Sequence, residues 1–275
     1  MKKIIYILTV ITLFSCSQED FNIANSNSAD AQRVLANSAD FQNFNISNHS
    51  SVMTSQIDFT GIFFRGLSDQ FSTTNAFSGF WSFCDQPRRS IVNSTTNDDL
   101  SSQAGGAWND FYSVITNANI VINNIENQEG KVVIDEVDLT NQELAGAYFD
   151  KGISLGYISL IYDKGYIVDP DTDTAALEFS TYQVILVSSI ANIKKSIEIS
   201  EFVTDYKYTI YPSGSDLNKT TFKQLANSYM ARFSIGQART NSEAIGLDYA
   251  TILNYANNGL TSDFSSSFFS ILLIF

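Results

Sequence analysis

Apolar side chains that recur every three or four residues are the feature of this sequence that most limits its fold. In the segment 107–127 the residues at this spacing are Trp108, Phe111, Tyr112, Ile115, Asn119, Ile122 and Ile125. Such spacing lines one face of an α-helix, which assigns Trp108 to the core. Four further segments show helical patterns, namely 143–165, 180–200, 220–238 and 241–259. The sequence therefore predicts an all-α domain in which helices follow one another in pairs.

The segment 143–165 is apolar on nearly every side, which predicts a central, buried helix. Gly152 and Gly156 lie one turn apart in it, where a neighbouring backbone could approach closely. The segment 180–200 is rich in Val and Ile, which would also suit a strand, but its length favours a helix. The paired helices suggest a TPR-like stack, although no repeat of about 34 residues with the TPR consensus is present.

Candidate helix caps and loops divide the rest of the chain. Ser28 and Ser38 are expected to cap short helices in the segment 28–44, and Asn241 to cap the last helix. The segment 61–100 combines glycines, a proline and many aromatics, which predicts a long structured loop with short helical pieces. Gly105 and Gly106 are interpreted as a flexible lead-in to the helix that follows.

The N-terminus carries an export signal. Lys2 and Lys3 precede an apolar run over residues 4–14, which is too short to span a membrane. The run leads into Cys16 as in a bacterial lipobox, so residues 1–15 are predicted to be a lipoprotein signal peptide and Cys16 to be acylated. Residues 16–28 are polar and predict a flexible tether.

Charge and cysteine content exclude several classes of protein. The net charge of −13 argues against binding to nucleic acid or adsorption to an anionic surface. Besides Cys16 the chain has only Cys84, so no disulfide is expected within the mature chain. Cys84 is interpreted as a small buried hydrophobic residue, because no histidine is paired with it to activate its thiol.

The residues needed for catalysis or metal binding do not form a recognisable site. His49 is the one histidine and lies in a polar stretch, which favours a solvated turn over a catalytic role. Three carboxylates spaced two apart resemble the start of a calcium loop, but Thr174 and Ser180 stand where an EF-hand needs Gly and Glu. The three carboxylates are those of Asp169, Asp171 and Asp173. We interpret them as part of an Asp-Pro turn. No metal and no cofactor are expected.

Ligand binding is easier to support than catalysis. Sugars present apolar ring faces and hydroxyls, which suit flat aromatic rings flanked by carboxylates, amides or arginine. Phe80, Trp81, Asp85 and Arg88 lie together in the aromatic-rich segment and are the candidate ligand-binding residues. The alternative for Trp81 is a place in the hydrophobic core, where tryptophan is on average highly buried.

Several segments, in order along the chain, resemble the SusD/RagB family of outer-membrane nutrient-binding lipoproteins of the Bacteroidota. Gln18, Glu19 and Asp20 resemble the acidic signal that sends such lipoproteins to the cell surface. The segment 107–125 is similar to the Trp, Tyr, Ile, Ala-Asn helix that is the most recognisable feature of the family. The other similar segments are 20–35, 80–95 with Gln86 in place of an acid, 147–169, 224–232 and 247–264.

The resemblance implies a TPR-like helical SusD fold with long irregular loops over residues 29–264. It also implies a lipid-anchored protein of the outer membrane, facing the cell exterior, that binds an oligosaccharide or similar nutrient, or a peptide. A TonB-dependent, SusC-like transporter would receive the ligand, and no bond would be broken. Family members are longer, so the uncapped apolar run at 265–275 is expected to be a truncated or frameshifted tail.

Two other functions stay open from the sequence. One is a helical scaffold lipoprotein that assembles envelope proteins. The other is a surface glycosidase, for which paired carboxylates such as Asp98 and Asp99 would need another acid facing them at a defined distance.

Overall fold

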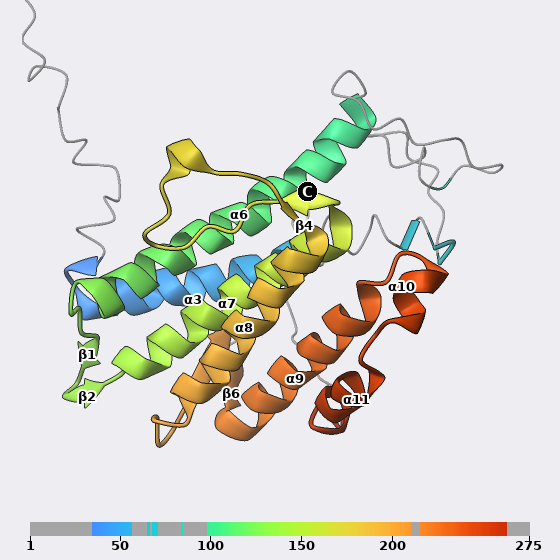
Figure 1. The fold of residues 1–275 in the computed structure, drawn as a ribbon. Helices are drawn as coiled ribbons and strands as arrows, with labels where there is room; N and C mark the ends of the chain where they lie inside the picture. The colour runs from blue at the N-terminus through green and yellow to red at the C-terminus, as the bar shows by residue number, and fades with distance from the viewer. Residues whose placement is uncertain are drawn as a thin grey trace, which may run out of the picture.

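The computed structural model describes residues 35–56, 65–66, 68–70, 84, 98–210 and 215–262. Helices dominate these ranges, which confirms the predicted helical fold (Figure 1). They are α3 (Ser38–Ser55), α6 (Asp98–Asn127), α7 (Thr140–Ile161), α8 (Tyr182–Ser200), α9 (Lys219–Gly236), α10 (Asn241–Ile245) and α11 (Tyr249–Asn257).

Short antiparallel hairpins join some of the helices. They pair β1 (Val133–Ile134) with β2 (Val137–Asp138), β3 (Lys164–Gly165) with β4 (Ser180–Thr181), and β5 (Lys207–Ile210) with β6 (Ser215–Asn218). In the second hairpin Lys164 lies opposite Thr181 and Gly165 opposite Ser180, so the ends of the α7–α8 connection are tied together. That connection also contains the short 3-10 helix η5 (Thr174–Ala176).

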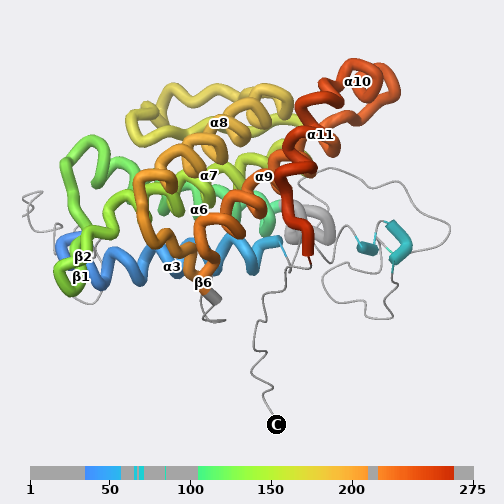
Figure 2. The backbone as a smooth tube through the Cα atoms, turned by 90° about the horizontal axis from the view of Figure 1, so that it is seen from below, coloured from blue at the N-terminus to red at the C-terminus, as the bar shows by residue number. Residues whose placement is uncertain are grey.

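Helix α7 is the centre of the fold, as predicted for the segment 143–165. It contacts α3, α6, α8 and α9, and nearly all of its side chains are buried. The two views show α6 and α9 on opposite sides of α7 (Figures 1 and 2). Because neighbours surround this helix, it has no solvent-exposed polar face, and even its charged residues Glu143, Asp150 and Lys151 are buried.

Both glycines of α7 mark close helix approaches. A Cβ added at Gly152 would lie 2.6 Å from Cγ1 of Ile193 and 3.1 Å from the carbonyl oxygen of Ser189, both on α8. A Cβ added at Gly156 would overlap the ring of Phe233 on α9. The predicted close approach of a neighbouring backbone is therefore confirmed at Gly152, whereas Gly156 makes room for a side chain, and the two contacts fix α7 against two different helices.

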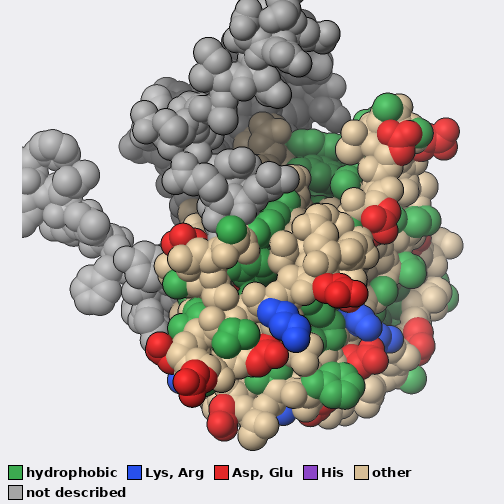
Figure 3. Space-filling view, turned by 90° about the vertical axis from the view of Figure 1, so that its left-hand side faces the viewer, with side chains coloured by type: hydrophobic (Ala, Val, Ile, Leu, Met, Phe, Trp, Pro, Cys, Tyr) green, Lys and Arg blue, Asp and Glu red, His purple; other side chains and the backbone are tan. Residues whose placement is uncertain are grey.

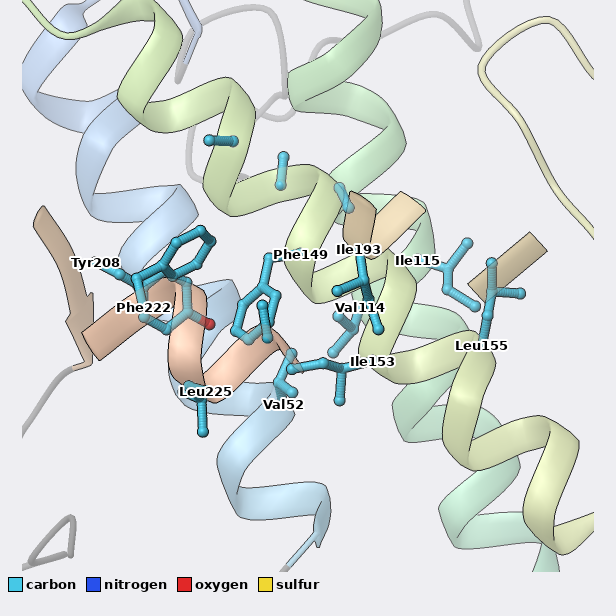
Figure 4. Packing of buried hydrophobic residues seen from close by; sticks show 14 of the residues in the cluster. Val52, Val114, Ile115, Phe149, Ile153, Leu155, Ile193, Tyr208, Phe222 and Leu225 are labelled. Carbon is cyan, nitrogen blue, oxygen red and sulfur yellow. The ribbon is translucent and has the colours of Figure 1, made fainter. Parts of the chain in front are cut away.

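The core is shared by all the long helices (Figure 4). Phe149 of α7 packs against the ring of Phe222 on α9 and that of Tyr208 on β5, with centroid distances of 4.8 and 5.2 Å. Val52, Val114 and Ile193 bring α3, α6 and α8 into the same cluster. This continuous core holds the middle of α6 and the C-terminal end of α7 in place, and the candidate site is built there.

The structure corrects the predicted C-terminal helix. The segment 241–259 divides into α10 and α11, because Gly246 ends the first and Asp248 caps the second by accepting from Thr251 N. The cap of α10 is Thr240, one residue before the predicted Asn241, and it forms a capping box with Glu243.

The start of the helical domain also differs from expectation. The side chain of Asn37, and not that of Ser38, caps α3 by accepting from Ala39 N and Asp40 N. Helix α6 begins at Asp98, so Gly105 and Gly106 lie inside a helix and do not form a flexible lead-in. Most of the loop predicted over 61–100 lies outside the described residues.

Candidate ligand-binding surface

The residues predicted from sequence to carry function lie outside the described ranges. These are Cys16, the export residues Gln18, Glu19 and Asp20, and the candidate ligand-binding residues Phe80, Trp81, Asp85 and Arg88. The signal peptide, the tether and the tail at 265–275 also lie outside them, so all these expectations stay predictions. Cys84 is described and is half-buried, not fully buried as expected.

The interpretation of His49 as a solvated turn residue is wrong. His49 lies within α3 and is only 4% exposed, with its Nδ1 against Oδ2 of Asp150 on α7. Its ring packs on that of Tyr208 at a centroid distance of 4.3 Å. The polar residues around it made this stretch look solvated, but Ser50 and Ser51 bond carbonyls of α3 itself and Asn48 bonds Val114 O on α6, so the stretch is helical and His49 faces inward.

We define the inner cluster as His49, Asp150, Tyr208, Asn45 and Glu143. The Tyr208 hydroxyl donates to Oδ1 of Asp150 at 2.7 Å, and Asn45 Nδ2 donates to Oε2 of Glu143 at 2.8 Å. Burial raises the pKa of Glu143 above its usual range, while the hydrogen bond from Asn45 and the nearby His49 act against this. All five residues are buried, so a substrate has no access to them and the cluster joins α3, α7 and β5.

The three carboxylates of the possible calcium loop have separate partners. Asp169 Oδ1 accepts from Lys151 Nζ at 2.5 Å, and Asp171 Oδ1 accepts from Asn127 Nδ2 at 3.3 Å. Asp173 caps η5 by accepting from Ala175 N. Across the part of the chain that the structure describes, no group of three acids, histidines or cysteines is placed to hold a metal ion.

Five aromatic rings gather where α6 and α7 meet the connection to α8, and we define them as the aromatic shelf. Trp108 contacts Tyr112, Tyr162 and Tyr166 at centroid distances of 4.6, 5.0 and 6.1 Å. Tyr166 and Phe179 stack at 4.2 Å with their planes 20° apart. Phe179 is 58% exposed, so its ring presents a flat apolar surface to solvent.

Hydrogen bonds fix the shelf to α6. The Tyr112 hydroxyl accepts from Tyr166 N at 2.5 Å and donates to Tyr166 O at 3.0 Å. Burial raises the pKa of Tyr112 to about 12, so this hydroxyl keeps its proton. A Cβ at Gly165 would lie 2.9 Å from that hydroxyl oxygen, and only glycine leaves this approach free. The position of Tyr166 therefore depends on Tyr112 and Gly165.

Trp108 is half-buried at this shelf, and its predicted place in the core is wrong. Ala107 and Phe111 on either side of it are buried in the core, but Trp108 packs against Tyr162 and Tyr166 of the α7–α8 connection and not against a core helix. Sequence reasoning also missed Tyr162, Tyr166 and Phe179 as candidate site residues. The available signal was the density of aromatic residues on both sides of the Tyr-Asp-Lys-Gly turn at 162–165.

Charged groups lie beside the shelf. The Arg239 guanidinium pairs with the exposed Asp163 and donates to the carbonyl oxygens of Ser159 and Tyr162 at 3.0 and 2.9 Å. It also lies 3.9 Å from the ring centroid of Tyr182. Because it satisfies carbonyls at the C-terminal end of α7, Arg239 holds this end in place. The ion pair of Arg239 and Asp163 thus lies at Tyr162, one of the residues of the shelf.

Polar hollows also lie elsewhere on the molecule, two of them between helices. A groove of about 430 Å³ between α3 and α6 is lined by serine and threonine hydroxyls with Asp110. A hollow of about 340 Å³ between α9 and α11 is lined by residues that include Lys219, Lys223 and Asn257. No described aromatic ring lines either one, so they offer hydrogen bonds without a stacking surface.

The surface is acidic, in keeping with the sequence. Asp and Glu side chains are spread over the face in Figure 3, with fewer Lys and Arg between them. Among the described helices, none combines the length and apolar character needed to cross a membrane.

Comparison with known proteins connects this geometry to one fold. No family model matches the sequence, and no curated protein matches it. The structure is similar to the crystal structure of a SusD superfamily protein from Bacteroides thetaiotaomicron, with a TM-score of 0.50 and 16% sequence identity. The match covers 80% of this chain and 48% of that protein, so this chain spans about half its length. The fold expected from the sequence resemblance is therefore confirmed.

Proposed function

We propose that this protein is a nutrient-binding lipoprotein of the cell surface whose aromatic shelf holds the ring faces of an oligosaccharide. The observation that carries the proposal is the stacked pair of Tyr166 and Phe179, with Phe179 open to solvent. A sugar ring has a flat apolar face that packs on such an aromatic surface. Its hydroxyls would find hydrogen-bond partners in the neighbouring Asp163 and Arg239.

The anchor and the partner complete the proposal. Acylated Cys16 would hold the protein in the outer membrane, with Gln18, Glu19 and Asp20 directing it to the outer face. The bound nutrient would pass to a TonB-dependent, SusC-like transporter. The SusD-like fold and the order of the similar sequence segments support this assignment.

Affinity gel electrophoresis with a panel of soluble polysaccharides tests the ligand. We expect at least one polysaccharide to retard the wild-type protein, and Phe179→Ala to weaken that binding by roughly 5-fold to 10-fold, the loss of one stacking contact of about 1 kcal/mol. Phe202→Ala is the matched control, because Phe202 is 75% exposed and lies outside the shelf. Equal binding by wild type and Phe179→Ala would show that the aromatic shelf is not part of the ligand-binding site.

Fractionation of cells tests the anchor. Cys16→Ala should release the protein from the membrane fraction, whereas replacing Gln18, Glu19 and Asp20 together by Ala should keep it there but protect it from protease added to whole cells. Retention of the Cys16→Ala variant in the outer membrane would refute the lipid anchor. Co-purification of the wild-type protein with a TonB-dependent barrel would identify the transporter.

A helical scaffold lipoprotein is the second candidate, and one observation favours it. Ile245 at the end of α10 is an exposed apolar residue, as are Tyr249 and Leu253, which lie one turn apart on α11. A group of exposed apolar side chains is typical of a protein contact. If cross-linking on cells captured an envelope protein with the wild type but not with Leu253→Asp, and no polysaccharide bound, the scaffold role would replace nutrient binding.

A further inference from the structure

The connection between α7 and α8, residues 162–181, crosses the outside of α6, and we name it the strap (Figure 1). Side chains from the helices below attach to it at successive points. Tyr112 and Asn119 of α6 bond the backbone of Tyr166 and Val168. Asn127, at the end of α6, reaches Asp171. The strap carries Tyr166 and Phe179, so its position determines the shape of the aromatic shelf.

Lys151 of α7 supports the attachment through Asn119 and adds a further one at Asp169. Its Nζ donates to Asp169 Oδ1 at 2.5 Å and to Asn119 Oδ1 at 2.8 Å. Because Lys151 is donating to the amide oxygen of Asn119, the amide nitrogen is left to donate to Val168 O, which it does at 2.8 Å. One ammonium group thus holds two strap residues. It bonds Asp169 directly, and it holds Val168 by way of Asn119.

Stability alone does not explain a lysine at this position. The Lys151 side chain is 1% exposed, and burial lowers its pKa below the usual range, so its charged form is disfavoured in the folded protein. The carboxylate of Asp169 is 60% exposed and is hydrated by solvent without Lys151. An unbranched apolar side chain such as Met would fill the same space without burying a charge.

We propose that Lys151 is a positioning residue that locks the strap against α6 and so sets the geometry of the aromatic shelf for its ligand. The importance of the shelf for ligand binding rests on the proposed function. The lock itself rests on the contacts of Lys151 with Asn119 and Asp169.

Hydrogen exchange on the free protein tests the lock. The Asp169 and Thr172 amides donate within the strap turn, to Thr172 Oγ1 and Asp169 O. In Lys151→Met we expect these amides to exchange at least about 10-fold faster, while the amides of α8 stay unchanged. The control is Lys195→Met on the exposed side of α8, which should leave the strap amides unaffected.

A fluorescence measurement reads the shelf directly. The chain has two tryptophans, so Trp81→Phe leaves Trp108 as the one emitter. Adding Lys151→Met should raise the quenching of Trp108 fluorescence by acrylamide, because a loosened strap would cover Trp108 less well. Asp169→Asn keeps a hydrogen-bond acceptor for Lys151 and should raise the quenching less. Unchanged strap exchange, or faster exchange in every helix, would overturn the positioning role.

The binding assay separates this inference from the proposed function. With a polysaccharide that the wild type binds, Lys151→Met should lower affinity in the same direction as Phe179→Ala. A wild-type protein that binds no polysaccharide would refute the proposed ligand, while the exchange and fluorescence results would still decide whether Lys151 locks the strap. Full affinity in Lys151→Met with a loosened strap would overturn the link between lock and ligand.

Discussion

Asp150 and Lys151 are neighbours on α7, yet their charges are buried in different ways. Asp150 faces α3 and β5, where its partner His49 is as buried as Asp150 itself. Lys151 faces α6 and the strap, where its partner Asp169 is largely exposed. Loss of a partner would leave an unpaired group in the protein interior in the first pair, whereas in the second pair water would hydrate the exposed Asp169 carboxylate if Lys151 were lost. The pair of His49 and Asp150 therefore stabilises the fold, whereas the pair of Lys151 and Asp169 places the strap on the surface.

The largest effect is expected from breaking the fully buried pair. Asp150→Ala removes the acceptor for both His49 and Tyr208 and should lower the free energy of unfolding by about 3–5 kcal/mol, measured by chemical denaturation. Replacing both His49 and Asp150 by Leu should restore part of this loss, because no unpaired charge remains. A loss below about 1 kcal/mol in Asp150→Ala would contradict the assignment of this pair to folding.

A smaller loss is expected at the tyrosine of the inner cluster. Tyr208→Phe leaves Oδ1 of Asp150 without its donor and should lower the free energy of unfolding by about 1–3 kcal/mol. Tyr206→Phe is the matched control, because the buried Tyr206 hydroxyl has no hydrogen-bond partner among the described residues. Equal losses in the two variants would mean that ring packing, and not the bond to Asp150, decides stability here.

Titration of Glu143 sharpens the comparison further. The pKa of Glu143 in the folded protein is raised above the usual 4.5. At pH values between 4.5 and this raised pKa, the folded state therefore binds more protons than the unfolded state. The contribution of Glu143 to stability is therefore complete below 4.5 and is lost as the pH rises through the raised pKa. Glu143→Gln should remove this slope, which for one group is at most about 1.4 kcal/mol per pH unit. An unchanged pH profile of unfolding would show that Glu143 titrates as an exposed acid.

The smallest effect is expected on the outer side of α7. Asp169→Asn keeps a hydrogen-bond acceptor for Lys151 on a side chain that is mostly in solvent, and should change the free energy of unfolding by about 0–1 kcal/mol. Thermal unfolding at low and high salt checks this. A loss as large as that of Asp150→Ala would make the two pairs equivalent and the comparison wrong.

The sequence predicts the helices well, because periodicity is a local property. The buried segment 143–165 corresponds to α7, and its two glycines contact α8 and α9 as the one-turn spacing indicates. The β5–β6 hairpin escapes this reasoning because its strands have only four residues each, although Tyr206 and Tyr208 are buried and alternate with the polar Lys207 and Thr209. Helix ends differ from the predicted positions where a neighbouring residue provides the capping side chain.

The candidate site is less predictable, because its residues meet only in the folded chain. His49 and Asp150 are 101 residues apart in sequence, and nothing in the polar stretch around His49 indicates its buried partner. Tyr166 and Phe179 stack because the β3–β4 pairing joins the two ends of the strap. The residues favoured by sequence, Phe80, Trp81, Asp85 and Arg88, lie outside the described ranges, so their relation to the shelf stays a prediction.

The β3–β4 ladder also makes the strap a natural position for inserted sequence. With Lys164 paired to Thr181 and Gly165 to Ser180, the ends of the connection stay together whatever its length. Closing a flexible loop of twice the length costs only about 0.6 kcal/mol more. A peptide tag inserted at η5 should therefore leave the helices intact and be displayed on the outside of the molecule.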